Sequence, residues 1–142
     1  MQVPIVTIIT TSKFDAAHYL PGYEGKCANL HGHTWIVEST ITGFVDFDTG
    51  MVMDFVKIKK VVMQFDHKCI NDEGMSMPTA ENLVIHFVQE LAKAGGQNLI
   101  AINCKVWESP SSLAQHGLIL QQVQQQPPPA QEVKNETSSK QT

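Results

Sequence analysis

"LHGHTWIVESTITGFV", residues 30–45, predicts a long β-strand and decides the fold of the chain. The segment before it, residues 3–18, is rich in β-branched residues and predicts another strand that runs to about His18. Between them, residues 19–29 are turn-prone, with Pro21 and two glycines. Because this connection is short, we expect the two strands to pair as an antiparallel hairpin.

Two later segments predict amphipathic helices. In residues 52–65 Asp54 is the expected N-cap, and apolar residues follow at helical spacing, namely Phe55, Ile58, Val62 and Phe65. In residues 78–96 Thr79 is the expected N-cap and a glycine pair ends the helix. The apolar residues of this second helix recur every four positions, at Leu83, Phe87 and Leu91.

Two further strands are expected at residues 98–109 and 113–123. The order strand, strand, helix, helix, strand, strand predicts an α+β domain, a four-stranded antiparallel sheet with both helices on one face. We assign this single domain to residues 1–122. Residues 123–142 are rich in glutamine and proline and then polar, a composition that predicts a disordered tail.

Composition excludes several classes of function. The net charge of −4 and the lack of a basic cluster argue against nucleic acid as a ligand. No apolar segment is long enough for a membrane span, and the beginning of the sequence lacks the features of a signal peptide. The three cysteines are irregularly spaced, which is not typical of a disulfide framework. These features together predict a cytoplasmic protein with reduced thiols.

Histidines gather at the hairpin. His31 and His33 are two apart on a predicted strand, so their side chains project from the same face. His18, at the end of the preceding strand, could supply a third imidazole. Three neutral imidazoles leave one open position on a tetrahedral Zn²⁺, which is typical of a catalytic site.

Cys27 has two possible roles. It lies four residues before His31 and could be a fourth zinc ligand, which would close a purely structural site. Alternatively it lies beside the metal as a thiolate that takes a proton from a substrate. Local spacing does not separate the two roles.

Asp66 directly precedes His67, and such a pair can shuttle a proton if the side chains meet in space. A solvated pair at the end of a helix is the alternative. His86 falls in the apolar pattern of the second helix and is expected to be a packing residue, and His116 carries no functional signal.

Six motifs together resemble the 6-pyruvoyl-tetrahydropterin synthase family. They occur in the family's order and spacing over about residues 5–120, and they read "FDAAH", "GKCANLHGHTW", "VMDF", "FDHKCIND", "PTAEN" and "VWES". The sequence looks most similar to the prokaryotic 6-carboxy-tetrahydropterin synthase branch, which works in queuosine and other 7-deazaguanine synthesis. The resemblance implies the tunnelling fold (T-fold), a homo-oligomer that is usually a hexamer, and active sites at subunit interfaces.

The resemblance also implies roles for individual residues. The three zinc ligands would be His18, His31 and His33. Cys27 matches the catalytic cysteine, and its proton-relay partners Asp66 and His67 would come from a neighbouring subunit. Glu108 matches the glutamate that anchors the pterin, Thr79 a pterin-contacting hydroxyl, and Glu81 lies near it. Because all ten basic residues are lysines, triphosphate must be bound by residues such as Lys13, Lys26 or Lys68.

The implied substrate is 7,8-dihydroneopterin triphosphate. The carboxy branch is a zinc-dependent lyase that releases triphosphate and acetaldehyde and leaves 6-carboxy-5,6,7,8-tetrahydropterin. The alternatives are 6-pyruvoyl-tetrahydropterin synthase, which stops after triphosphate elimination, and a non-catalytic pterin-binding protein with structural zinc held partly by Cys27.

Overall fold

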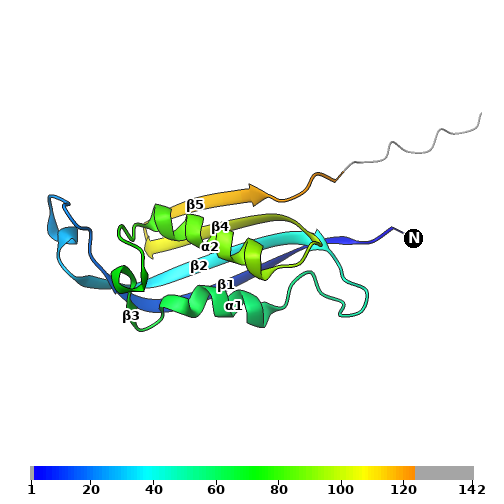
Figure 1. The fold of residues 1–142 in the computed structure, drawn as a ribbon, viewed down its shortest axis with the longest axis horizontal. Helices are drawn as coiled ribbons and strands as arrows, with labels where there is room; N and C mark the ends of the chain where they lie inside the picture. Colours follow the sequence, from blue (N-terminus) through cyan, green and yellow to red (C-terminus); the bar gives the residue numbers. More distant parts are fainter. Residues whose placement is uncertain (1, 124–142) are drawn as a thin grey trace, which may run out of the picture.

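The computed structural model describes residues 2–123. The two strands of the predicted hairpin are β1 (Ile5–His18) and β2 (His31–Phe44), each of 14 residues. They pair antiparallel in one unbroken register, from Ile5 opposite Phe44 to His18 opposite His31. The predicted hairpin is confirmed, and it forms the centre of the sheet (Figure 1).

β4 (Leu99–Ser109) pairs with β2, and β5 (Ser112–Ile119) pairs with β4, in both cases antiparallel. The last strand is therefore shorter than the predicted 113–123. A fifth strand, β3 (Lys68–Cys69), joins the other edge of the sheet, parallel to β1 at Ala16 and Ala17. The predicted four strands are all present, but the sheet has five, in the order β3-β1-β2-β4-β5.

Both helices lie on one face of the sheet, as predicted (Figure 1). α1 (Phe55–Val62) begins after Asp54, whose carboxylate accepts the N–H of Val56 at 2.8 Å. It ends in a 3-10 turn, Met63–Phe65. α2 (Ala80–Ala94) begins after Thr79, whose hydroxyl accepts the N–H of Asn82 at 3.2 Å. Both predicted N-caps are confirmed.

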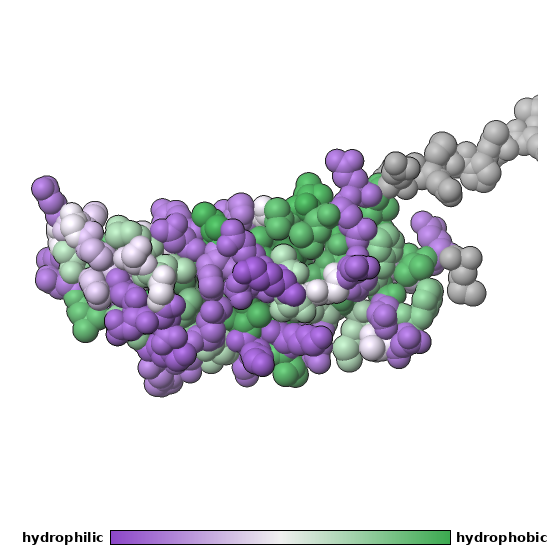
Figure 2. All heavy atoms as spheres, viewed as in Figure 1, coloured by the Kyte–Doolittle hydropathy of each residue, from purple (hydrophilic) through white to green (hydrophobic). Residues whose placement is uncertain are grey.

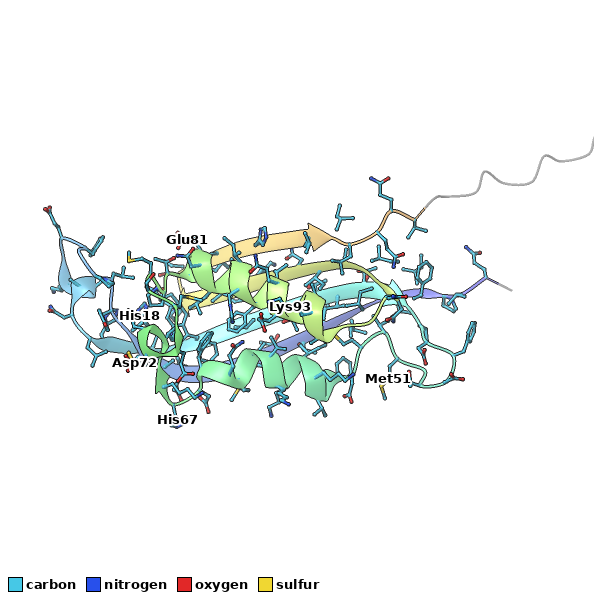
Figure 3. All side chains as sticks on the ribbon, in the orientation of Figure 1. His18, Met51, His67, Asp72, Glu81 and Lys93 are labelled. Atoms are coloured by element: carbon cyan, nitrogen blue, oxygen red, sulfur yellow. The ribbon has the colours of Figure 1, made fainter. Side chains whose placement is uncertain are left out.

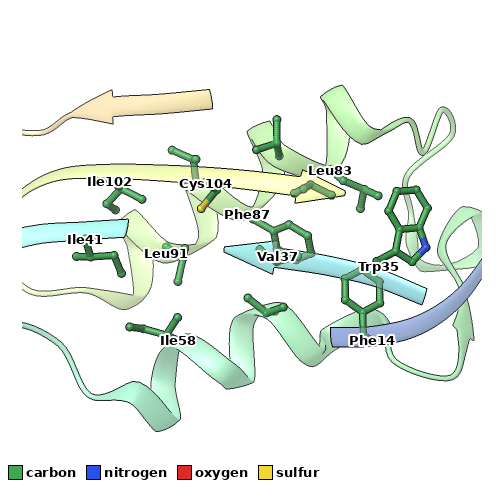
Figure 4. Packing of buried hydrophobic residues seen from close by; sticks show 14 of the residues in the cluster. Phe14, Trp35, Val37, Ile41, Ile58, Leu83, Phe87, Leu91, Ile102 and Cys104 are labelled. Carbon is green, nitrogen blue, oxygen red and sulfur yellow. The ribbon is translucent and has the colours of Figure 1, made fainter. Parts of the chain in front are cut away.

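The hydrophobic core fills the space between the helices and the sheet (Figure 4). Phe14 of β1 stacks on Trp35 of β2 with ring centroids 6.2 Å apart, and Phe87 of α2 meets Phe14 edge-on. Of the regularly spaced apolar residues of α1, Phe55 does not join this core but is 57% exposed, while Ile58 is buried. Phe55 is the first residue of the helix.

Hydrophilic residues cover most of the helical face, and hydrophobic ones gather toward the end from which the N-terminus leaves (Figure 2). At that end Val6 of β1 and Met51 of the loop between β2 and α1 border a groove of about 280 Å³. None of the helices among the described residues is long and apolar enough to cross a membrane. The predicted tail, residues 123–142, lies outside the described residues except for Val123.

Candidate metal centre and catalytic residues

Three histidines meet where the hairpin strands leave the sheet. His18 is the last residue of β1 and pairs with His31, the first residue of β2, while His33 pairs with Ala16. The side chains of all three lie on the helix-covered face because residues two apart on a strand point the same way. Their ligand atoms all lie within 4.8 Å of one another. The predicted cluster therefore forms.

Main-chain carbonyls orient two of the imidazoles. Nδ1 of His18 lies 2.7 Å from the carbonyl oxygen of Pro78, and Nδ1 of His31 lies 2.7 Å from that of Asn29. A carbonyl oxygen only accepts, so each Nδ1 carries the proton and each Nε2 keeps a lone pair. These two Nε2 atoms are 3.1 Å apart. Two lone pairs at this distance repel unless a proton or a cation lies between them.

His33 completes the set. Its Nε2 is buried and has no hydrogen-bond partner within residues 2–123. The nearest carboxylate oxygen, Oε1 of Glu108, is 3.8 Å away, beyond hydrogen-bonding distance. A buried polar atom without a partner costs free energy. Coordination of a metal would satisfy this atom and both Nε2 atoms of His18 and His31, so the three residues fit a metal ion.

Burial also favours the neutral, metal-binding form of His18 and His33. Burial lowers the pKa of His18. The hydrogen bond to Pro78 partly offsets this decrease, and the charge of a protonated His31 would add to it. Burial lowers the pKa of His33 as well, partly offset by the charge of Glu108. His18 is 1% exposed, so its charged form would be poorly solvated.

The lowered pKa values predict how the metal-free protein responds to acid. In the unfolded chain both histidines take up protons near their ordinary pKa of 6.5, whereas in the folded chain they do so only at lower pH. Stability should therefore be highest above pH 6.5 and fall as the pH drops below it. We expect the melting temperature of the chelator-treated protein to decrease from pH 7.5 to 5.5. His33→Gln should make this decrease shallower, and a decrease as steep as that of the wild type in this variant would contradict the assignment.

Cys27 lies on the loop that joins β1 to β2, in a short 3-10 turn, Lys26–Ala28, and is half-buried. The N–H of Leu20 donates to the carbonyl of Cys27 at 2.9 Å, which closes the loop. Among the described residues, the metal-binding cluster contains only histidines, and Cys27 is outside it. In this structure Cys27 is therefore not a fourth member of the histidine cluster. Cys104 is unsuited to proton transfer because burial raises the pKa of its thiol to about 11.

Asp66 and His67 form a contact, which the sequence left open. Oδ2 of Asp66 is 2.9 Å from Nδ1 of His67, and Oδ1 of Asp66 accepts the N–H of Asp15 at 3.0 Å. The N–H of His67 donates to the carbonyl of Asp15 at 2.7 Å, with His67 at a φ of 60°. The hydrogen bond with Asp66 raises the pKa of His67. The pKa of Asp66 is lowered, mainly by the hydrogen bond from the N–H of Asp15 and to a lesser degree by the hydrogen bond with His67.

His67 points away from the metal centre of its own chain. It lies at the β3 edge, while His18 lies inside, at the end of β1 (Figure 3). The side chain of His67 is 80% exposed. No hydrogen bond among the described residues joins Cys27 to Asp66 or His67. The chain therefore brings the three histidines together but does not bring the relay pair to Cys27.

A groove of about 520 Å³ runs beside His67, between β1, β2 and the start of β3. Asp15 and Thr34 line it and are hydrogen-bonded to each other, and Lys68 borders it. Lys68 is also paired with Glu73 at 3.3 Å. The other two lysines considered for triphosphate, Lys13 and Lys26, are exposed.

Of the three residues matched to pterin binding, Glu108 lies at the metal centre, 3.8 Å from His33, with its side chain one third exposed. Thr79 caps α2 and directly follows Pro78, whose carbonyl holds His18. Glu81 is exposed in the first turn of α2, at the same end of the molecule as His18 (Figure 3). All three lie at this end, but only Glu108 has a contact with a metal-binding residue.

Sequence reasoning missed the carbonyls of Pro78 and Asn29, and it missed Asp15. A carbonyl carries no residue-specific signal, so only its position could have pointed to it. Asn29 lies two residues before His31, and Pro78 lies directly before the N-cap of α2.

Comparison with known proteins finds related sequences and structures. The family model described as 6-pyruvoyl tetrahydropterin synthase matches residues 7–117. A 6-carboxy-5,6,7,8-tetrahydropterin synthase of Synechocystis is 36% identical, with 72% of this chain and 86% of that protein aligned. A relative from Archaeoglobus fulgidus, to which the same activity is ascribed provisionally, is 41% identical over 67% of this chain and 83% of its own.

Among solved structures, 6-pyruvoyl tetrahydropterin synthase of Caenorhabditis elegans superposes with a TM-score of 0.63 and 27% identity. The match covers 82% of this chain and 97% of that one. The predicted tunnelling fold is confirmed, with β3 as an addition to the expected four strands. The chain belongs to the 6-pyruvoyl tetrahydropterin synthase family.

Proposed function

We propose that the protein is a zinc-dependent lyase. It converts 7,8-dihydroneopterin triphosphate and water into 6-carboxy-5,6,7,8-tetrahydropterin, acetaldehyde and triphosphate. The observation that carries the proposal is the convergence of three imidazoles, with the buried Nε2 of His33 left unpaired within the described residues. An all-nitrogen set of three ligands suits Zn²⁺ with one position open for substrate. The carboxy product is supported by the names of the relatives from Synechocystis and Rickettsia felis.

In the proposed complex Glu108 orients the pterin. Its carboxylate can accept two parallel N–H bonds, from the 2-amino group and from a ring nitrogen. The position supports this role, because Glu108 on β4 lies 3.8 Å from His33 and has no closer ion pair within residues 2–123. The side chain of the substrate would then extend from Glu108 toward the three histidines. Thr79 and Glu81 are proposed to contact the pterin as well.

A bound Zn²⁺ would act as a Lewis acid on the hydroxyl oxygens of the substrate side chain and make the adjacent protons easier to remove. Cys27 is proposed to take the proton from carbon, and His67, oriented by Asp66, to return or receive it. Loss of triphosphate leaves a side chain with two adjacent carbonyl groups. Cleavage of the bond between them takes up one water and yields a carboxylic acid and acetaldehyde, which balances the reaction.

We infer that Asp66 and His67 act on a neighbouring copy of the chain in a homo-oligomer, with a hexamer expected from the family resemblance. This inference is supported by the exposure of His67 and by its outward direction from the β3 edge (Figure 3). The contacts of Asp66 and His67 with Asp15 fix the pair without a partner. The pair is thus oriented before assembly. The setting we propose is the cytoplasm and the synthesis of queuosine and related 7-deazaguanines.

A second candidate is 6-pyruvoyl-tetrahydropterin synthase activity, which the name of the Caenorhabditis elegans structure favours. It uses the same site but stops after triphosphate elimination. A non-catalytic protein with structural zinc is disfavoured because Cys27 lies outside the histidine cluster.

The test is incubation of the zinc-loaded protein with 7,8-dihydroneopterin triphosphate, followed by mass analysis of the pterin and an assay for acetaldehyde. We expect 6-carboxy-5,6,7,8-tetrahydropterin and one acetaldehyde for each triphosphate released. A 6-pyruvoyl product without acetaldehyde would select the second candidate. The absence of pterin turnover in protein that retains its zinc would exclude both enzymatic functions.

A further inference from the structure

Asn71 holds the main chain at the end of β1 with both of its side-chain polar groups. Its Oδ1 accepts the N–H of Tyr19 at 3.0 Å, and its Nδ2 donates to the carbonyl of Tyr19 at 2.9 Å. The regular ladder between β1 and β3 ends two residues earlier, where Ala17 faces Cys69. The amide of Asn71 therefore continues this ladder beyond the last backbone pair, and it is half-buried.

Tyr19 lies between the two parts of the proposed site. It directly follows His18 and directly precedes Leu20, whose N–H donates to the carbonyl of Cys27 at 2.9 Å. Fixing both polar groups of the Tyr19 backbone therefore fixes the position from which His18 leaves the sheet. It also fixes the beginning of the loop that carries Cys27.

We propose that Asn71 is a positioning residue for the metal centre. It holds His18 against Pro78 and holds the Cys27 loop at a set distance from the three imidazoles. This proposal rests on the proposed function, because it assigns Asn71 to the same site. Asn71 touches neither metal nor substrate, so it acts only through Tyr19. The segment Asp66–Asn71 would then contribute to the site at both of its ends. Asp66 and His67 lie at its start, and Asn71, with its two hydrogen bonds to Tyr19, lies at its end.

The chain offers a matched control in Asn98. Nδ2 of Asn98 donates to the carbonyls of Phe44 and Val52, each at 2.8 Å. Like Asn71, Asn98 is half-buried and ties main-chain groups of two segments together. It lies just before β4, where Phe44 ends β2, at the end of β2 opposite to His31. Asn98→Ala thus removes a comparable structural contact without touching the site.

The experiment compares the wild type, Asn71→Ala and Asn98→Ala in the full chain. Melting temperatures should fall by similar amounts in both variants, since each loses two hydrogen bonds to main-chain groups. Zn²⁺ affinity, measured by competition with a chromophoric chelator, should weaken about 10-fold in Asn71→Ala only, the low end of the effect of residues that orient metal ligands. Alkylation of Cys27 by iodoacetamide in metal-free protein, followed by peptide mass spectrometry, should also be faster in that variant only.

Equal Zn²⁺ affinity and equal Cys27 alkylation in Asn71→Ala and Asn98→Ala would overturn the proposal. If Asn71→Ala does not fold, Asn71→Ser is used in its place. We expect weaker Zn²⁺ binding and faster Cys27 alkylation in that variant too. Values equal to those of Asn98→Ala would again overturn the proposal. Failure of the proposed function is distinguishable, because it would appear in the wild type as absence of pterin turnover. In that case the effects of Asn71→Ala on Zn²⁺ affinity and on Cys27 alkylation would still test the positioning role of Asn71.

Discussion

Cys27→Ala is expected to lower kcat by about 100- to 10,000-fold, the usual contribution of one general acid–base step. Zinc content should stay at about one ion per chain, because Cys27 lies outside the cluster formed by the three histidines. The measurement is steady-state pterin formation alongside metal analysis of the same protein sample. This pair of results separates a base beside the metal from a fourth ligand.

Cys69→Ser is the control, since Cys69 is also a half-buried free thiol but lies on β3. A hydroxyl there keeps a donor for Oδ1 of Asn71, from which the Cys69 thiol lies 3.9 Å away. The turnover of this variant should remain close to that of the wild type. If Cys27→Ala instead loses its zinc, the thiol is a ligand and the structural interpretation holds. If it keeps both zinc and full activity, another residue is the base.

His33→Ala is expected to weaken Zn²⁺ binding strongly. Loss of a residue that only orients a metal ligand typically weakens binding by about 10- to 100-fold, and loss of the ligand itself should have a larger effect. The variant leaves two imidazoles, whose Nε2 atoms remain 3.1 Å apart without the third donor. Activity should be lost together with the metal. Because a bound metal stabilises the folded state, added Zn²⁺ should raise the melting temperature of the wild type but not of this variant.

His116→Ala serves as the control for His33→Ala, because His116 is exposed on β5. It should bind Zn²⁺ like the wild type. Retention of wild-type zinc affinity by His33→Ala would show that His33 is not a ligand. Its unpaired Nε2 would then need another partner.

The hairpin could be predicted from the sequence because each of its strands is long and strongly β-favouring, and the turn between them is short. The two N-caps could be predicted because Asp54 and Thr79 directly precede apolar helical patterns. β3 could not be predicted, since Lys68–Cys69 is too short to show a periodic pattern and exists only through its contact with β1. Long-range pairing of this kind leaves no local signal.

Only part of the candidate site could be predicted from the sequence. The clustering of the three histidines followed from the two-residue spacing of His31 and His33 and from the position of His18 at a strand end. The orientation of the imidazoles did not, because it depends on the carbonyls of Asn29 and Pro78, and Pro78 is 60 residues from His18. The contact of Asp66 with His67 also needed the structure, since its geometry depends on the backbone of Asp15 and on the positive φ of His67.

The pairing of His18 with His31 has a consequence for folding. A shift of β1 by one residue against β2 would turn His18 to the other face of the sheet, away from His31 and His33. The native alignment of the two strands presents three imidazoles to one ion, and an alignment shifted by one residue does not. We therefore expect bound metal to stabilise the native alignment of β1 and β2 relative to alignments that are shifted by one residue.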